Sequence, residues 1–139
     1  PDIKPDIKLD CFWGSSIPKS YVDADSERLD IYKRLEHTHH TKVDEIRDEI
    51  IDRFGELPEV SHNLFLTAKI RSVLSEKNIL RCKIRESQIE LFPVDLTEEG
   101  HLRIKTLYKK FIFRNKRLVL NFKDVLTPDS VYGILNSSL

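Results

Sequence analysis

One stretch decides the fold: residues 43–58, which read VDEIRDEIIDRFGELP. Four of its apolar residues are three or four positions apart, which is the repeat of one face of an α-helix. They are Val43, Ile46, Ile50 and Phe54. Gly55 follows them, and glycine often ends a helix because it adopts left-handed backbone conformations at little cost. The stretch therefore predicts an amphipathic helix from about Lys42 to Phe54.

The opposite face of this predicted helix is acidic. Four carboxylates on it are related by three or four residues and share one surface, which we call the acidic stripe. They are Glu45, Asp48, Glu49 and Asp52. Like charges at this spacing weaken an isolated helix by about 0.2–0.5 kcal/mol per pair, and Arg47 and Arg53 offset them in part. Such a stripe is usually a solvated face, but it also suits docking on a basic partner whose arginines pair with carboxylates.

Other elements precede and follow this helix. An alternating apolar pattern over residues 7–11 predicts a strand. A helix capped by Asp25 or Ser26 comes next and fades in the polar stretch 37–41. A third helix is predicted over 58–78, because the proline at its start is tolerated in a first helical turn.

The second half of the chain alternates short strands with helices. We predict strands over 79–84, 88–92, 111–114 and 118–122, with helices over 97–110 and from Thr127 onward. Asn115 and Lys116 separate the last two strands and are predicted to form a hairpin turn.

These elements together define the predicted fold class and domain organisation. The class is α+β: an N-terminal strand and a three-helix segment followed by a small mixed sheet packed with helices. We expect residues 1–24 to form an extended leading segment that contains a strand. Residues 25–139 are expected to form a single α+β domain, helical over about 25–78 and rich in strands over about 79–139.

Composition argues against several classes of function. The chain carries 23 basic and 23 acidic residues, so it lacks the basic excess typical of a stand-alone nucleic-acid binder. Its four glycines lie far apart, which argues against a glycine-rich phosphate loop. No apolar run reaches the roughly 18 residues of a membrane span. The charged start at residues 1–8 indicates no signal peptide, and a first residue other than methionine indicates a fragment or a processed chain. Cys11 and Cys82 are expected to be reduced.

A basic stretch near the end supports an alternative function. Residues 108–117 interleave lysines and arginines with aromatic residues, a pattern that can stack nucleic-acid bases. The cations are Lys109, Lys110, Arg114, Lys116 and Arg117, and the aromatic residues are Tyr108, Phe111 and Phe113. We favour a simpler interpretation, in which a strand turns its aromatic side chains to the core and its charges to water. A stand-alone nucleic-acid-binding module is therefore the alternative to a protein-docking domain.

Residues suited to catalysis or metal binding are sparse. His37 and His40 are three residues apart and, with Asp44, could hold a metal, but no further ligand has a regular spacing. We therefore interpret residues 37–41 as a solvated turn. Cys82 and His101 could form a nucleophile and base, but their pairing is arbitrary. We expect no catalytic residue, metal or cofactor in this chain.

Two segments carry a resemblance to a known family. They read RLDIYKRL over residues 28–35 and EIIDRFGELP over residues 49–58, and Ile17-Pro18 and Tyr21-Val22 precede them. Together they resemble the C-terminal domain of the bacterial transcription-repair coupling factors. The resemblance covers about Ile7 to Leu80 and is weaker beyond, where the order of elements and the Phe122-Lys123 region are similar.

The resemblance implies a regulatory, autoinhibitory domain that is not itself an enzyme. In this family the domain clamps an N-terminal module similar to UvrB and masks the surface that recruits UvrA. The full-length protein is an ATP-dependent DNA translocase that displaces stalled RNA polymerase, and its motor, with ATP and magnesium, lies outside this chain. The implied partners are the UvrB-like module, RNA polymerase, UvrA and double-stranded DNA, in the bacterial cytoplasm and without a membrane.

The resemblance also implies which residues form the clamp contact. In this family the acidic residues of a Glu-x-x-Asp step face the basic module, and they match Glu49 and Asp52. Helical geometry adds Glu45 and Asp48 to the same surface. The sequence therefore predicts a protein-interaction site formed by the acidic stripe.

Overall fold

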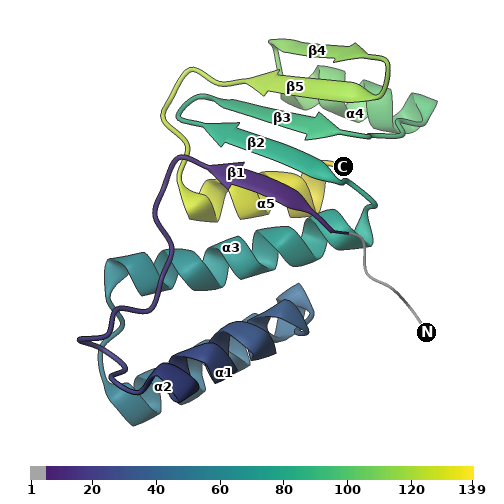
Figure 1. Cartoon of the computed structure of the whole chain (residues 1–139). Helices are drawn as coiled ribbons and strands as arrows, with labels where there is room; N and C mark the ends of the chain where they lie inside the picture. The colour runs from purple at the N-terminus through teal and green to yellow at the C-terminus, as the bar shows by residue number, and fades with distance from the viewer. Residues whose placement is uncertain (1–5) are drawn as a thin grey trace, which may run out of the picture. The chain divides into compact units, whose positions relative to one another are not determined.

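A computed structural model describes residues 6–139 (Figure 1). Its elements are β1 Lys8–Cys11, α1 Asp25–Glu36, the 3-10 helix η1 His40–Lys42, α2 Val43–Phe54, α3 Glu59–Glu76, β2 Arg81–Arg85, β3 Gln88–Phe92, α4 Glu98–Leu107, β4 Phe111–Arg114, β5 Arg117–Asn121 and α5 Pro128–Ser138. Contacts divide the chain into two compact units. The sheet unit comprises the described residues up to Phe12 together with Val73–Leu139, and the helical unit comprises Trp13–Ser72. Among the described residues, no helix combines the length and the hydropathy needed to cross a membrane.

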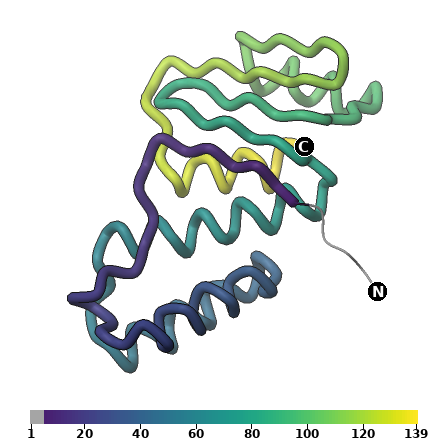
Figure 2. The backbone as a smooth tube through the Cα atoms, in the orientation of Figure 1, coloured from purple at the N-terminus to yellow at the C-terminus, as the bar shows by residue number. Residues whose placement is uncertain are grey.

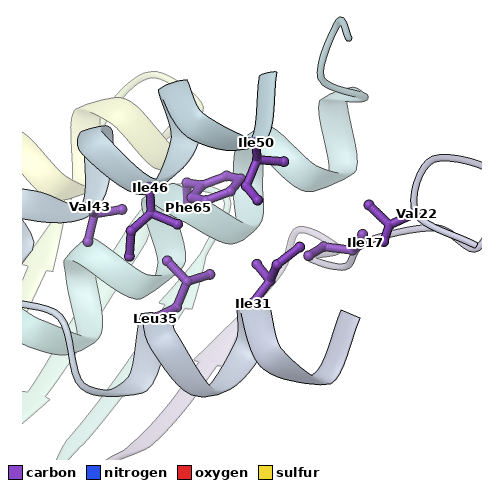
Figure 3. Packing of buried hydrophobic residues seen from close by; sticks show 8 residues of the cluster. All are labelled: Ile17, Val22, Ile31, Leu35, Val43, Ile46, Ile50 and Phe65. Atoms are coloured by element: carbon purple, nitrogen blue, oxygen red, sulfur yellow. The ribbon is translucent and has the colours of Figure 1, made fainter. Parts of the chain in front are cut away.

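In the helical unit, α1 and α2 each bury one face in a common apolar cluster (Figure 3). The buried members are Ile17, Val22, Ile31, Leu35, Val43, Ile46, Ile50 and Phe65. Three of the four apolar residues predicted for α2 are among them, and the fourth, Phe54, is partly buried against the cluster. Burial of side chains of this size stabilises a fold by roughly 1.5–3 kcal/mol each. The cluster therefore fixes the direction in which the opposite, acidic face of α2 points.

Local sequence sets both ends of α2. Before it, the ring nitrogen Nδ1 of His39 accepts a hydrogen bond of 3.3 Å from the backbone N–H of Thr41 and so caps η1. At the other end, Gly55 has a φ of +92° and donates its N–H to the carbonyl of Ile51 at 2.8 Å. The hydroxyl of Tyr21 donates to the carbonyl of Gly55 at 2.7 Å. The predicted helix end at Gly55 is confirmed.

The sheet unit contains a five-stranded mixed sheet in the order β1-β2-β3-β5-β4. β1 is parallel to β2, and the other neighbouring strands are antiparallel. Figure 2 shows the backbone of β1 alongside β2, although Lys8 is paired with Arg81 from much later in the chain. The predicted α+β class with a mixed sheet is confirmed.

Side chains of the sheet alternate between a buried face and an open face. The buried face carries side chains with almost no exposure: Cys82, Ile84, Ile89, Leu91, Leu118 and Leu120. Buried residues of α4 and α5, Ile104, Val131 and Leu135, complete this part of the core. The intervening strand positions form the open face, where every side chain is exposed or partly exposed. The period of two therefore places one row of side chains in the core and the next in solvent.

The structure corrects three local expectations and confirms a fourth. Helix α1 begins at Asp25 and its N-cap residue is Ala24, so neither Asp25 nor Ser26 caps it. Helix α4 ends at Leu107 and not at Lys110, because the backbone of Tyr108 is extended and leads into β4. The stretch 37–41 is not a fully solvated turn: His40 is 7% exposed and donates its backbone N–H to the Ser72 hydroxyl at 2.9 Å. The predicted hairpin turn between β4 and β5 is confirmed by the positive φ angles of its two central residues.

Candidate functional site

The acidic stripe lies on the solvent side of α2. Its four carboxylates, Glu45, Asp48, Glu49 and Asp52, are all exposed. Val43, Ile46 and Ile50 of this helix are in the buried cluster, so the helix cannot rotate to hide the stripe without losing that burial. The structure thus brings the four residues onto one surface, as their spacing predicts.

Glu49 has a partner within the helical unit. Its Oε2 accepts a hydrogen bond from Nη1 of Arg34, which projects from α1. This hydrogen bond, together with the positive charge of Arg34, lowers the pKa of Glu49 below its ordinary value, and Arg53 lowers it further. The side chains of Glu49 and Arg34 are 55% and 40% exposed, so solvent screens the pair. Glu49 is held by a contact that water and other ions can replace.

The other three stripe residues are more weakly engaged. Asp48 is 3.1 Å from the guanidinium of the adjacent Arg47, and Glu45 is 3.6 Å from the ammonium of Lys42 one turn earlier. Exposed pairs of this kind contribute about 0–1 kcal/mol. Within residues 6–139, no ion pair involves Asp52. Asp52 therefore presents a carboxylate that has no cation to give up.

Asp44 is also on α2 but belongs to the fold and not to the stripe. Its carboxylate is 2.7 Å from the ammonium of Lys69 and 3.4 Å from the guanidinium of Arg47. The hydrogen bond from Lys69 is the main cause that lowers the pKa of Asp44, and the charge of Arg47 adds to it. Since Lys69 is 13% exposed, this contact anchors α2 to α3.

A groove lies between α1 and α2, beside the stripe. It has a volume of about 370 Å³. Its lining combines carboxylates and guanidinium groups over an apolar floor: Ser26, Glu27, Asp30, Ile31, Arg34, Glu49, Ile50, Arg53 and Phe54. Arg53 pairs with Glu27 across the two helices at 2.8 Å, and its guanidinium lies 4.9 Å from the ring centroid of Phe54. A groove with this lining can accept a cationic side chain next to Glu49.

Sequence reasoning missed the ion pairs that α2 makes with the neighbouring helices: Glu49 with Arg34, Arg53 with Glu27, and Asp44 with Lys69. Arg34 and Glu27 are on α1, and Lys69 is on α3. These residues lie outside α2 at no regular spacing from their partners, so no periodicity in the sequence could have indicated the pairs.

The residues considered for catalysis or metal binding lie outside the acidic stripe. Cys82 is 1% exposed, and burial raises the pKa of its thiol, which makes it a poor nucleophile. His101 is exposed and packs edge-on against Phe111, with 5.8 Å between the ring centroids. The carboxylate of Asp44, which we considered from the sequence as a metal ligand and did not favour, contacts Lys69 and Arg47 as described above.

The basic stretch 108–117 follows the simpler interpretation. In β4, Phe111 and Phe113 are partly buried, whereas Ile112 and Arg114 are exposed. The aromatic rings of β4 therefore face the core side of the sheet and are not presented as a platform for bases.

The fold and the exposed stripe define a class of protein: a small α+β domain with an acidic surface on one helix. A family model described as the TRCF domain matches residues 14–102, and the chain belongs to this family. A transcription-repair-coupling factor of Buchnera aphidicola is 34% identical over 110 residues, which are 78% of this chain and 13% of that protein. A protein of the same name from Mycobacterium bovis is 28% identical over 105 residues, or 74% of this chain and 8% of its own length.

A solved structure shows the same fold. The crystal structure of the C-terminal domain of a transcription-repair coupling factor aligns with a TM-score of 0.78 and covers 95% of this chain and 89% of its own. The two sequences are 18% identical, so this match supports the fold. The chain spans about an eighth or less of the length of the curated relatives described above. The predicted membership in a family of transcription-coupled DNA repair is confirmed.

Proposed function

We propose that this chain is the C-terminal regulatory domain of a transcription-repair coupling factor and acts as an autoinhibitory clamp. The acidic stripe docks on a basic, UvrB-like N-terminal module of the same protein and masks the surface that recruits UvrA. The observation that supports this proposal is the exposure of all four stripe carboxylates on a helix whose other face is buried. A fixed and exposed acidic surface complements a basic one.

Glu49 and Asp52 contribute to docking in different ways. Asp52 offers its carboxylate without first releasing a cation. Glu49 exchanges Arg34 for an arginine of the partner, and this exchange costs little because the existing pair is exposed. A bidentate pair between Glu49 and an arginine of the partner, in a less hydrated interface, is stronger than the exposed pair with Arg34.

The clamp works because both surfaces belong to one polypeptide. The linking chain gives the two surfaces a high effective concentration, so modest ionic contacts hold the closed state. A polar interface of this kind also opens readily. RNA polymerase shifts the equilibrium by binding the open state more tightly.

The full-length protein, under this proposal, is an ATP-dependent DNA translocase of the bacterial cytoplasm. Its motor, with ATP and magnesium, lies outside this chain, and its partners include RNA polymerase, UvrA and double-stranded DNA. The present domain then controls access to UvrA and performs no chemistry itself.

The decisive experiment measures capture of UvrA by the full-length protein. We expect the double substitution Glu49→Ala/Asp52→Ala to open the clamp, because two ionic contacts of about 0.5–1 kcal/mol each are lost. A total of about 1–2 kcal/mol changes the open fraction by a factor of about 5–30. A pull-down with purified UvrA, or a titration followed by biolayer interferometry, measures the change.

A matched control uses two acids outside the stripe. Glu86 and Asp124 are exposed and lie in loops of the sheet unit, and Glu86→Ala/Asp124→Ala removes the same charge. This variant should capture UvrA no better than the unmodified protein. If the stripe variant shows no gain, or if both variants gain equally, the clamp does not act through the acidic stripe.

A further inference from the structure

The open face of the sheet is strongly basic, although the chain as a whole is neutral. Six cations on it come from four of the five strands: Lys8, Arg81, Lys83, Arg85, Arg114 and Arg117. All six are exposed. Two acids, Asp10 and Glu90, share the face. The strands therefore gather on one surface a positive charge that composition does not reveal.

Four of these cations form a line across the whole sheet, which we call the basic row: Lys8, Arg81, Arg117 and Arg114. Lys8 is directly opposite Arg81, which is in turn opposite Phe92. The guanidinium of Arg117 lies 5.9 Å from the centroid of the Phe92 ring, and Arg114 is directly opposite Arg117. The row thus extends from one edge strand, β1, to the other, β4.

The row places like charges next to each other. Lys8 opposes Arg81, and Arg114 opposes Arg117, and like charges directly opposite on neighbouring strands destabilise a sheet. Arg117 is 3.9 Å from Glu90, whereas no ion pair involves the other three within the described chain. Asp10 is held by Arg85 at 3.0 Å and does not neutralise the row. A bound polyanion would remove this repulsion.

The spacing of the row suits an extended polyanion. Neighbouring strands lie about 4.8 Å apart, so a line across five strands is about 19 Å long. Three of the four cations are arginines, whose planar guanidinium groups bind phosphate oxygens through two parallel hydrogen bonds. The backbone register holds their attachment points rigidly, which favours a stiff ligand over a flexible acidic peptide.

We propose that the basic row binds the sugar–phosphate backbone of a DNA duplex. A single strand is the poorer ligand, because single-strand sites stack bases on exposed aromatic rings. The aromatic ring on this face, Phe92, is partly buried and has Arg117 above it. Contacts to phosphate alone carry no base information, so binding is independent of sequence.

This surface is separate from the acidic stripe in both residues and charge. The proposal rests on the strand register and does not depend on the clamp. If the stripe plays no role in UvrA capture, the proposed DNA binding by the basic row still stands. If the basic row does not bind DNA, the proposed clamp still stands.

The experiment measures anisotropy of a fluorescent duplex of about 20 base pairs, two helical turns, titrated with this chain at several salt concentrations. With three to four phosphates neutralised, the logarithm of the binding constant should fall with the logarithm of salt concentration with a slope of about −3. The substitutions Arg81→Ala/Arg114→Ala should weaken binding roughly tenfold or more and reduce the magnitude of the slope by about 2. These substitutions also relieve like-charge repulsion, so the variant should remain folded by circular dichroism.

The matched control removes two cations from α4. Arg103 and Lys105 are exposed, and Arg103→Ala/Lys105→Ala causes the same loss of charge away from the open face. This variant should keep the affinity of the unmodified chain within about twofold. Equal losses in both variants, or a duplex that does not bind at low salt, would overturn the proposal. So would a single strand or polyglutamate of equal charge that binds as tightly as the duplex.

Discussion

At the scale of single residues, Arg34 determines how Glu49 behaves. The guanidinium donates a hydrogen bond to the Glu49 carboxylate and stabilises its charged form, which lowers the pKa of Glu49. The stability from this pair is fully present above the ordinary pKa of a glutamate and is lost as pH falls through the lowered pKa. In the proposed clamp, Arg34 holds Glu49 until an arginine of the partner replaces it.

The substitution Arg34→Ala tests this role directly. We expect the pKa of Glu49 to rise toward its ordinary value, because the hydrogen bond and most of the nearby positive charge are removed. Carboxyl-carbon NMR chemical shifts followed from neutral to acidic pH measure the change. The control, Lys33→Ala, removes an exposed cation from the same helix and should leave the Glu49 titration nearly unchanged. Equal shifts in both variants would show that general charge, and not the contact, sets the pKa of Glu49.

At the scale of elements, α2 combines an acidic surface with features that keep it helical. Asp44 and Glu45 lie in its first turn and Arg53 in its last, as the helix dipole favours. Asp44 also reaches Lys69 on α3, and the apolar face is buried. The helix therefore tolerates the mutual repulsion of the stripe, which a free peptide of the same sequence would not.

The end of α2 makes a second test possible. Gly55 combines a φ of +92° with a ψ of −165°, a conformation that is essentially restricted to glycine. Gly55→Ala should lower the free energy of unfolding by about 1–3 kcal/mol. Urea denaturation followed by circular dichroism at 222 nm, the usual helix wavelength, measures the loss.

The control for this test is Gly133, which also has open space around it but lies inside a helix. Gly133 lies within α5, and a methyl group there would meet nothing within 4 Å. Gly133→Ala should leave stability unchanged or raise it by about 0.5–1 kcal/mol, since alanine favours helix. A destabilisation equal to that of Gly55→Ala would refute the conformational explanation.

At the scale of the whole molecule, a net charge of zero conceals two surfaces of opposite charge. The acidic stripe belongs to the helical unit and the basic row to the sheet unit. The zero net charge predicted little affinity for nucleic acid, but a sum over the chain does not show how charges are distributed. Two surfaces of opposite sign can each bind a different partner.

The two surfaces should act independently. Glu49→Ala/Asp52→Ala should change duplex affinity by less than about twofold at physiological salt, because the stripe shares no residue with the basic row and salt screens exposed charges. The same anisotropy titration measures this, with Arg81→Ala/Arg114→Ala as the positive control. A large gain in duplex affinity on removal of the two acids would mean that the stripe competes with DNA for the basic row.

Much of the fold was predictable because its elements are short-range patterns. The period of α2, the end at Gly55 and the turn at Asn115 and Lys116 all follow from residues close in sequence. The stripe itself was predictable for the same reason. The pairing of Arg34 with Glu49 and the alignment of the basic row were not, because they depend on helix packing and strand register.

The parallel pairing of β1 with β2 has a consequence for synthesis on the ribosome. Lys8 is synthesised about seventy residues before Arg81. Strand β1 therefore has no hydrogen-bonding partner strand while the intervening helices are synthesised. Those helices enclose their apolar cluster within residues 13–72 and can condense during translation. The nascent sheet assembles last, and its leading strand needs protection from aggregation until then.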